Sequence, residues 1–302
     1  MRNPSPQSLE IRQSLVRSTL RPGVTLEEQR REWEDHAASL PLAKGVTFEP
    51  EIIGDVPCAW LRNPDHQNDD VIIYFHGGGL VVGSMITHRE MVSRLVNATG
   101  RSALLVDYRL VPETPFPGAL DDATKVYRGL IERHRLNPQQ VILGGDSSGA
   151  VLVLSLLVRL RETQQPQPRC AFAISGAFDA CLSGDSMHMR AALDPCLCVD
   201  ELRDWQRHFK DDPGLESPEL SPLFADLHGL PPILLQVGSD EVWFSDSARV
   251  AQKIEDAAGP LESQVWPGMW HVWPMWSALP ETGETLTEIA RFISQQPENL
   301  TA

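Results

Sequence analysis

The sequence has no apolar run long enough to cross a bilayer. Its longest apolar stretch, Ala150 to Val158, is interrupted by Ser155 and falls far short of the roughly 20 residues that a membrane-spanning helix needs. The first residues, MRNPSPQSLEIRQ, also lack the apolar core of a signal peptide. These absences predict a protein without stable membrane insertion, and we expect it in the cytoplasm.

Basic residues and paired cysteine motifs are scarce as well. Lys and Arg total 26 against 41 Asp and Glu, which gives a net charge of −15. A chain of this charge repels nucleic acid and anionic membranes, so neither is an expected partner. The five cysteines are odd in number, and Cys196 and Cys198, separated by one residue, match no common metal spacing. The sequence therefore predicts free thiols and no bound metal.

The order of the apolar segments predicts an α/β fold. Short apolar runs, as expected of buried strands, alternate with longer helical segments. The expected strands are 46–53, 59–62, 71–75, 102–106, 141–143, 170–174, 233–237 and 262–266. The expected helices between or beside them are 88–98, 120–133, 150–161, 202–209 and 245–257. This alternation is typical of a mostly parallel sheet that is covered by helices on both faces.

Two segments depart from the alternation. Residues 1–45 contain no strong strand and are expected to be helical, with Thr25 and Glu28 in the pattern of a capping box. Residues 180–224 are rich in loops and read as an insertion between strands. We interpret residues 46–302 as a single catalytic domain. Residues 1–45 precede it, and residues 180–224 are an insertion within it.

A G-x-S-x-G pattern, Gly145-Asp146-Ser147-Ser148-Gly149, lies between an expected strand and an expected helix. At such a turn the pattern is typical of a nucleophile elbow, in which small neighbours allow a strained serine to project above the sheet. A phosphate-binding loop would need a lysine that this segment lacks. A tight glycine turn without catalytic function is the other alternative.

The segment His76-Gly77-Gly78-Gly79 directly follows the expected strand 71–75. Consecutive glycines have a high entropic cost and suggest a backbone that must approach another group closely. Amides in this loop, together with the amide of Ser148, are suited to binding the oxyanion of a tetrahedral intermediate. A flexible loop is the alternative.

A nucleophilic serine needs a base, and the base needs a carboxylate that fixes its tautomer. Of the histidines after the elbow, only His271 follows a late strand. Asp240 comes just past the expected strand 233–237, at the sheet edge where sites gather in open α/β sheets. Glu241 and Asp246 are alternatives, although Glu241 requires a shifted register and Asp246 is expected to cap a helix.

Together these segments resemble the hormone-sensitive-lipase-like family of α/β-hydrolases, which includes many bacterial carboxylesterases. The matching blocks are HGGG at 76–79, DYRLVPE at 107–113 with Phe116-Pro117 and Asp121 after it, GDSSGA at 145–150 and GMWH at 268–271. The chain departs from the family pattern by Ser148 in place of Ala, by Ala150 in place of Gly, and by Glu241-Val242-Trp243 after Asp240 where many members have Pro-Leu.

The resemblance implies an α/β-hydrolase fold with a helical cap built from residues 1–45 and the insertion at about 180–224. It implies a catalytic triad of Ser147, Asp240 and His271. It also implies an oxyanion hole formed by the amides of Gly78, Gly79 and Ser148. The chemistry that it implies is acyl transfer through an acyl-enzyme, which needs no metal or organic cofactor.

The expected substrate is a small ester or lactone with a short to medium chain. Trp205, Phe209 and Trp270 are candidate residues of its binding pocket, since aromatic side chains often line apolar sites. An amidase or N-acetyl hydrolase with the same triad is an alternative. A non-catalytic receptor, such as the plant gibberellin receptors, is another, but such proteins tend to lose the histidine that is present here as His271. The sequence leaves a homodimer open.

Overall fold

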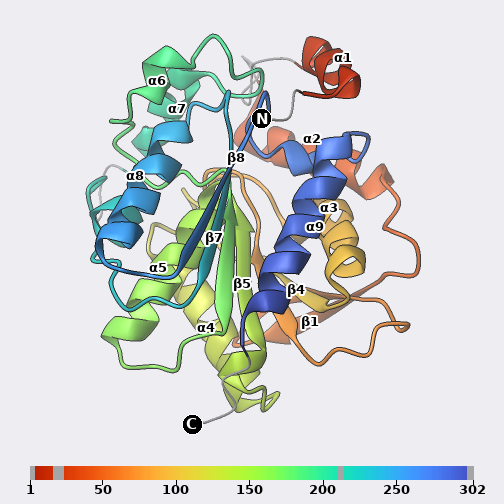
Figure 1. Cartoon of the computed structure of the whole chain (residues 1–302). Helices are drawn as coiled ribbons and strands as arrows, with labels where there is room; N and C mark the ends of the chain where they lie inside the picture. The colour runs from red at the N-terminus through yellow and green to blue at the C-terminus, as the bar shows by residue number, and fades with distance from the viewer. Residues whose placement is uncertain (1–3, 16–23, 210–213, 298–302) are drawn as a thin grey trace.

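The computed structural model describes residues 4–15, 24–209 and 214–297, and its centre is an eight-stranded sheet (Figure 1). The strands are β1 (Thr47–Ile53), β2 (Val56–Arg62), β3 (Val71–Phe75), β4 (Ser102–Val106), β5 (Val141–Asp146), β6 (Cys170–Ile174), β7 (Ile233–Gly238) and β8 (Leu261–Trp266). They lie in the order β1-β2-β4-β3-β5-β6-β7-β8. Only β2 runs against the others, because β1 and β4 both pair with it antiparallel and every later pairing is parallel.

Helices cover both faces of this sheet. The α-helices are α1 (Pro6–Ser14), α2 (Leu26–Ser39), α3 (Met85–Thr99), α4 (Gly118–Glu132), α5 (Ser148–Glu162), α6 (Ser186–Met189), α7 (Val199–Trp205), α8 (Phe244–Asp256) and α9 (Pro280–Gln295). One face packs against α4, α5 and α8, and the other against α3 and α9, which lie side by side (Figure 1).

The central strands are buried on both faces, and this explains why they read as continuous apolar runs. All five residues of β3 are buried. Two adjacent residues of this strand, Ile72 and Ile73, belong to the core clusters on opposite faces of the sheet. Alternate side chains of a strand point to opposite faces, so a sheet sandwiched between helices needs apolar residues at every position. The alternation of strands and helices is therefore confirmed as a mostly parallel α/β sheet with helices on both faces.

The eight expected strands all occur where the sequence places them, and the capping box of Thr25 and Glu28 is present at the start of α2. The C-terminal helix α9 was not expected. Its buried residues Leu286, Ile289 and Ile293 recur at helical spacing, which is the signal that identifies it. Parts of the two expected cap segments, residues 16–23 and 210–213, lie outside the described residues. In the described part of the chain no helix is long and apolar enough to cross a membrane.

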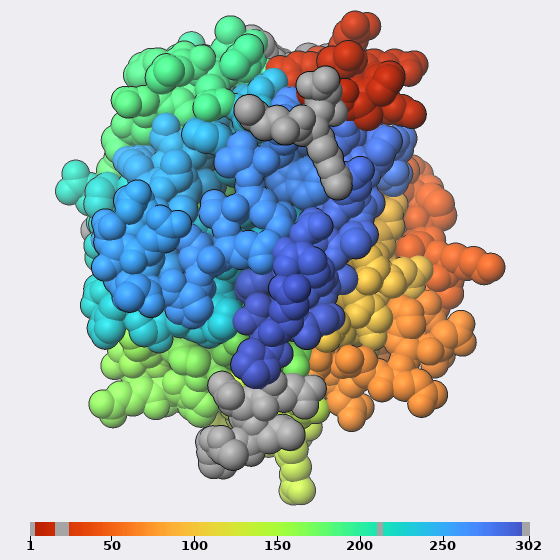
Figure 2. Space-filling view, in the orientation of Figure 1, coloured from red at the N-terminus to blue at the C-terminus, as the bar shows by residue number. Residues whose placement is uncertain are grey.

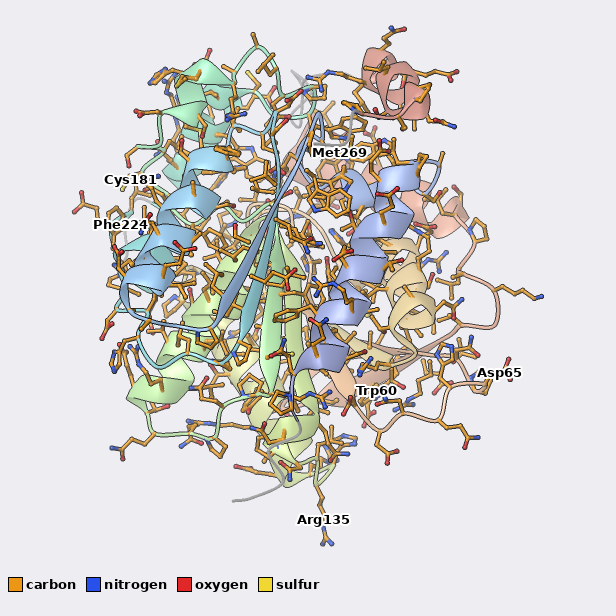
Figure 3. All side chains as sticks on the ribbon, viewed as in Figure 1. Trp60, Asp65, Arg135, Cys181, Phe224 and Met269 are labelled. Atoms are coloured by element: carbon orange, nitrogen blue, oxygen red, sulfur yellow. The ribbon has the colours of Figure 1, made fainter. Side chains whose placement is uncertain are left out.

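Four helices gather at one end of the sheet. Figure 1 shows α1, α2, α6 and α7 at the top of the molecule, and α1 there contacts the turns that follow β7 and β8. This is consequently the end at which the parallel strands finish. Arg135, which precedes β5, is labelled at the opposite end in Figure 3. The carboxyl edge of the sheet is thus enclosed by segments from both the N-terminus and the 180–224 insertion.

Removing side-chain volume from the central strand should cost stability. Leu143 in β5 is fully buried, and we expect Leu143→Ala to lower the free energy of unfolding by about 2–5 kcal/mol because it leaves a cavity. Leu9→Ala is the matched control, because Leu9 is 54% exposed. Its loss should stay below about 1 kcal/mol. Urea unfolding followed by circular dichroism measures both, and equal losses would contradict the assignment of β5 to the core.

Candidate active site

Ser147 occupies a sharp turn between β5 and α5. Its backbone has φ 52° and ψ −119°, a combination that non-glycine residues rarely adopt. Such strain persists only where the surrounding structure enforces it, and it is common at active sites. The turn places the hydroxyl of Ser147 in contact with a histidine, as the elbow pattern predicts.

The glycines on either side of the elbow are required by close backbone contacts. A Cβ atom on Gly149 would lie 2.0 Å from the carbonyl oxygen of Phe75, at the end of β3. A Cβ atom on Gly145 would lie 2.6 Å from the carbonyl carbon of Gly149. No side chain fits at these separations. The G-x-S-x-G spacing therefore reflects how tightly the start of α5 packs on the strands beside it.

The glycine loop after β3 lies next to the elbow. Gly78 and Gly79 both have positive φ values, 121° and 65°, and both line the same cavity as Ser147. The hydroxyl of Ser148 accepts a hydrogen bond from the amide of Leu80 at 3.1 Å, which ties this loop to the elbow. Among the described residues, no hydrogen bond of a turn or loop uses the amide of Gly78 or Gly79, and Ser148 is the first residue of α5, where an amide has no acceptor within the helix.

His271 connects the serine to a carboxylate. Its Nε2 lies 2.9 Å from the Oγ of Ser147, and its Nδ1 lies 3.1 Å from Oε2 of Glu241. The three side chains come from turns that follow β5, β7 and β8, and all three residues are buried. Met269, two residues before His271, is labelled at this end of the molecule in Figure 3.

The carboxylate at His271 differs from the one expected from the sequence. Asp240 does not contact His271; its Oδ2 accepts a hydrogen bond from Arg12 at 2.8 Å, and its Oδ1 accepts one from the hydroxyl of Ser239. The expectation for Asp240 is corrected in favour of Glu241, the alternative that required a shifted register.

The turn after β7 explains this register. The amide of Asp240 donates to the carbonyl of Met269, and the amide of Glu241 donates back to the carbonyl of Gly238. This geometry directs Glu241 inward, where its Oε1 accepts hydrogen bonds from the amide of Gly238 at 2.6 Å and the hydroxyl of Ser175 at 2.7 Å. Its other oxygen remains for His271.

Asp246, the other alternative, makes structural contacts away from His271. It is fully buried in the first turn of α8, accepts a hydrogen bond from the amide of Asp179 and contacts Arg249. Burial and the nearby charge of Asp179 raise the pKa of Asp246 to about 8, against the opposing effect of Arg249. None of its contacts reaches His271.

The charges around His271 favour its protonated form. Burial alone would lower the pKa of the imidazole, but the hydrogen bond and the charge of Glu241 outweigh it, with Asp194 and Asp146 adding to the effect. The pKa of His271 is therefore raised above its ordinary value of 6.5. An imidazole in this setting accepts a proton from Ser147 and is stabilised as the cation.

A buried polar layer supports the elbow from below. Asp146 accepts a hydrogen bond from the hydroxyl of Tyr74 at 2.8 Å and lies 3.4 Å from Nε2 of His88. The amide nitrogen of Gly77 lies 3.3 Å from the same Nε2, so His88 joins the glycine loop to the residue before the nucleophile. Burial alone would raise the pKa of Asp146. The charge and the hydrogen bond of His88 outweigh burial, so the pKa is lowered overall. Asp146 is thus an anion that holds the elbow.

An apolar cavity of about 690 Å³ opens above Ser147. Trp205 and Phe209 line it, as the sequence predicts. Trp270 does not; it is fully buried against Trp276 in the core beneath α9.

Several residues at the cavity escaped the sequence analysis. Trp33 of α2 and Trp243 line its wall beside Trp276, and Asp194 is buried close enough to raise the pKa of His271. Trp33 and Asp194 belong to segments without a recognisable motif. Only their tertiary placement brings them together. Among the described residues no group of three or more His, Cys, Asp or Glu side chains is arranged to hold a metal ion.

The sequence is similar to those of known hydrolases. A family model described as the α/β hydrolase fold matches residues 72–275. An acetyl-hydrolase of Streptomyces hygroscopicus is 36% identical over 238 residues, which is 79% of each chain. An esterase of Acinetobacter venetianus is 36% identical over 226 residues, or 74% of each chain.

Solved structures resemble the whole chain. The crystal structure of an esterase from the bacterial hormone-sensitive lipase family is 34% identical, with a TM-score of 0.91 over 97% of this chain and 99% of that one. The structure of EstE5 soaked with p-nitrophenyl butyrate is 34% identical, with a TM-score of 0.89 over 96% of this chain and 98% of that one.

The charge of Glu241 should be measurable at His271. We expect the imidazole of His271 to titrate above pH 6.5 in the wild type and at a lower pH in Glu241→Gln, because the variant loses the anion that stabilises the imidazolium. NMR of protein labelled with ¹⁵N-histidine, assigned with a His271→Gln variant, measures this. Asp240→Asn is the matched control, and a larger fall in that variant would return the contact to Asp240.

Proposed function

Because the chain belongs to the α/β-hydrolases, within the bacterial hormone-sensitive-lipase-like esterases, we propose that it hydrolyses carboxylic esters through an acyl-enzyme on Ser147. The family expected from the sequence motifs is thereby confirmed. The observation that carries the mechanism is the continuous contact from Ser147 through His271 to Glu241 at the floor of an apolar cavity.

In the first step His271 accepts the proton of Ser147 while the serine oxygen attacks the ester carbonyl. The distance of 2.9 Å between Oγ and Nε2 is suitable for this transfer. Glu241 holds Nδ1 as the protonated nitrogen, which leaves Nε2 as the acceptor, and it stabilises the imidazolium that forms. The imidazolium then protonates the leaving alcohol.

The negative oxygen of the tetrahedral intermediate is assigned to the amides of Gly78, Gly79 and Ser148. All three residues line the cavity beside Ser147, and the first turn of α5 adds a favourable helix dipole. These donors are fixed before the substrate arrives, because the loop is tied to the elbow through Leu80 and Ser148. In the second step water, activated by His271, releases the acid and restores Ser147.

We assign residues 4–15, 24–45 and the described part of 180–224 to a cap over the substrate site. Trp33 of α2 and Leu40, which directly follows this helix, line the cavity from one side. Trp205 and Phe209 line it from the insertion, and a Cβ atom on Gly79 would lie 1.8 Å from the ring of Trp205. Bulky side chains so near the nucleophile shorten the space for an acyl chain, which supports a preference for short to medium chains.

The arrangement favours an enzyme over a receptor, because Ser147 and His271 are both present and in contact. An amide substrate would use the same residues, and the acetyl-hydrolase relative makes small acyl groups the first to test. We also propose a cytoplasmic location, since all five cysteines are free thiols, two of them buried, and reducing conditions keep thiols unpaired.

The choice between the two carboxylates can be tested by kinetics. Glu241→Gln should lower kcat for p-nitrophenyl butyrate by about 10³–10⁴-fold, because the amide no longer stabilises the imidazolium. Asp240→Asn should lower kcat by at most about tenfold, since the carboxylate of Asp240 pairs with Arg12 and not with His271. Ser147→Ala should abolish both turnover and labelling by a fluorophosphonate. Near-normal turnover in Glu241→Gln would refute its role, provided that the melting temperature is unchanged.

The length of the acyl pocket can be tested at Phe209. Phe209→Ala should raise kcat/KM for p-nitrophenyl octanoate relative to butyrate, because it removes bulk from the cavity wall. Phe224→Ala is the matched control: Phe224 is 41% exposed and is labelled on the outer side of the molecule in Figure 3. A panel of p-nitrophenyl esters from acetate to palmitate measures the profile. An identical profile in both variants would remove Phe209 from the acyl site.

A further inference from the structure

We propose that Arg12, on the N-terminal helix α1, is a positioning residue that fixes the turn carrying Glu241 relative to the turn carrying His271. This inference rests on the proposed function, because it assigns those two residues to acid and base. It gives α1 a direct part in catalysis that is separate from covering the substrate.

Three loops converge on the guanidinium of Arg12. Its Nη1 donates to Oδ2 of Asp240 at 2.8 Å and to the carbonyl of Gly268 at 3.3 Å, and its Nη2 donates to the carbonyl of Leu193. These acceptors belong to the turn after β7, the turn after β8 and the insertion. Figure 2 shows α1, in red, resting on this end of the molecule.

Each acceptor is close in sequence to a charged group at the site. Asp240 directly precedes Glu241, and Gly268 comes three residues before His271. Leu193 directly precedes Asp194, whose Oδ2 accepts a hydrogen bond from the amide of Val242 at 3.1 Å. A displacement of any of these three backbones would therefore move the acid, the base or the buried anion beside them.

Asp240 is the centre of the link between the two turns. Its amide donates to the carbonyl of Met269, and Ser239 both donates to Oδ1 of Asp240 and accepts from the amide of Gly268 at 2.8 Å. Arg12 occupies the remaining carboxylate oxygen and the carbonyl of Gly268. The guanidinium therefore completes a ring of hydrogen bonds that spans both turns from outside.

The chemistry of this contact favours arginine over lysine. A planar guanidinium offers five donors in a fixed geometry, whereas the ammonium of lysine is a point charge on a flexible chain. The side chains of Arg12 and Asp240 are 25% and 21% exposed, so their ion pair by itself adds little to global stability. Besides this contact, α1 is held by Ser5, which donates to Glu281 from both its amide and its hydroxyl.

The contribution of Arg12 should be measurable as a change in turnover. Arg12→Met should lower kcat for p-nitrophenyl acetate by about tenfold with KM changed by less than about twofold, because a small misplacement of acid and base acts on the chemical step. Arg12→Lys should recover part of the loss. Asp240→Asn combined with Arg12→Met should be no worse than Arg12→Met alone, since both substitutions remove the contact between Arg12 and Asp240.

Two further measurements separate positioning from other roles. If Glu241 moves away from His271, the pKa of the imidazole falls, so the acid limb of kcat/KM should shift to lower pH in Arg12→Met. Arg31→Met is the matched control: Arg31 is an exposed arginine of α2 that pairs with Glu27 in its own helix, and the kinetics of the variant should match the wild type.

A purely structural role would lower the melting temperature of Arg12→Met and leave its kcat and acid limb at wild-type values. A role in the cap alone would change KM for long-chain esters only. Either result would overturn the proposal. Fluorophosphonate labelling and ester turnover of the wild type come first: if both fail, the proposed function is wrong, whereas an active wild type with an equally active Arg12→Met refutes this inference alone.

Discussion

The start of α5 lies against the end of β3 at a distance that only backbone atoms can occupy. Gly149 approaches the carbonyl of Phe75 so closely that a Cβ atom would clash, and Ser147 takes a strained conformation as a result. The same contact brings the glycine loop after β3 beside the elbow. Nucleophile and free amides are therefore neighbours because two glycine-rich turns finish at the same point of the sheet, and buried polar contacts from Asp146 hold them there.

Electrostatics then determine what the elbow can do. His271 is buried, which disfavours its cation, but Glu241 contacts it directly and Asp194 lies nearby. The acids outweigh burial, so a proton that leaves Ser147 has a stable place on the imidazole. Glu241 itself is fixed by Gly238 and Ser175, which leaves one of its oxygens for the histidine. The cavity above these groups is lined mainly by apolar side chains, and surroundings of low polarity strengthen each interaction.

Two helices outside the sheet layers, α1 and α7, also contact residues at this site. Helix α1 reaches the turns after β7 and β8 through Arg12, and α7 packs its Trp205 against Gly79. Helix α1 thus contacts the turns that carry Glu241 and His271, and α7 contacts the glycine loop. Changes in α1 are expected to alter turnover, whereas changes at Trp205, which also lines the cavity, are expected to alter turnover and substrate size.

Local patterns in the sequence determined the strands, the nucleophile and the histidine. Apolar runs identify β3 and β5, and the glycine spacing around Ser147 follows from backbone contacts that any such turn must make. The acid could not be chosen in this way, because Asp240 and Glu241 are adjacent carboxylates with the same chemistry after the same strand. Their orientations depend on Arg12, Ser175 and Met269, which come from segments far apart in the chain. Only the tertiary structure brings these partners to the turn, turning Asp240 toward α1 and Glu241 toward His271.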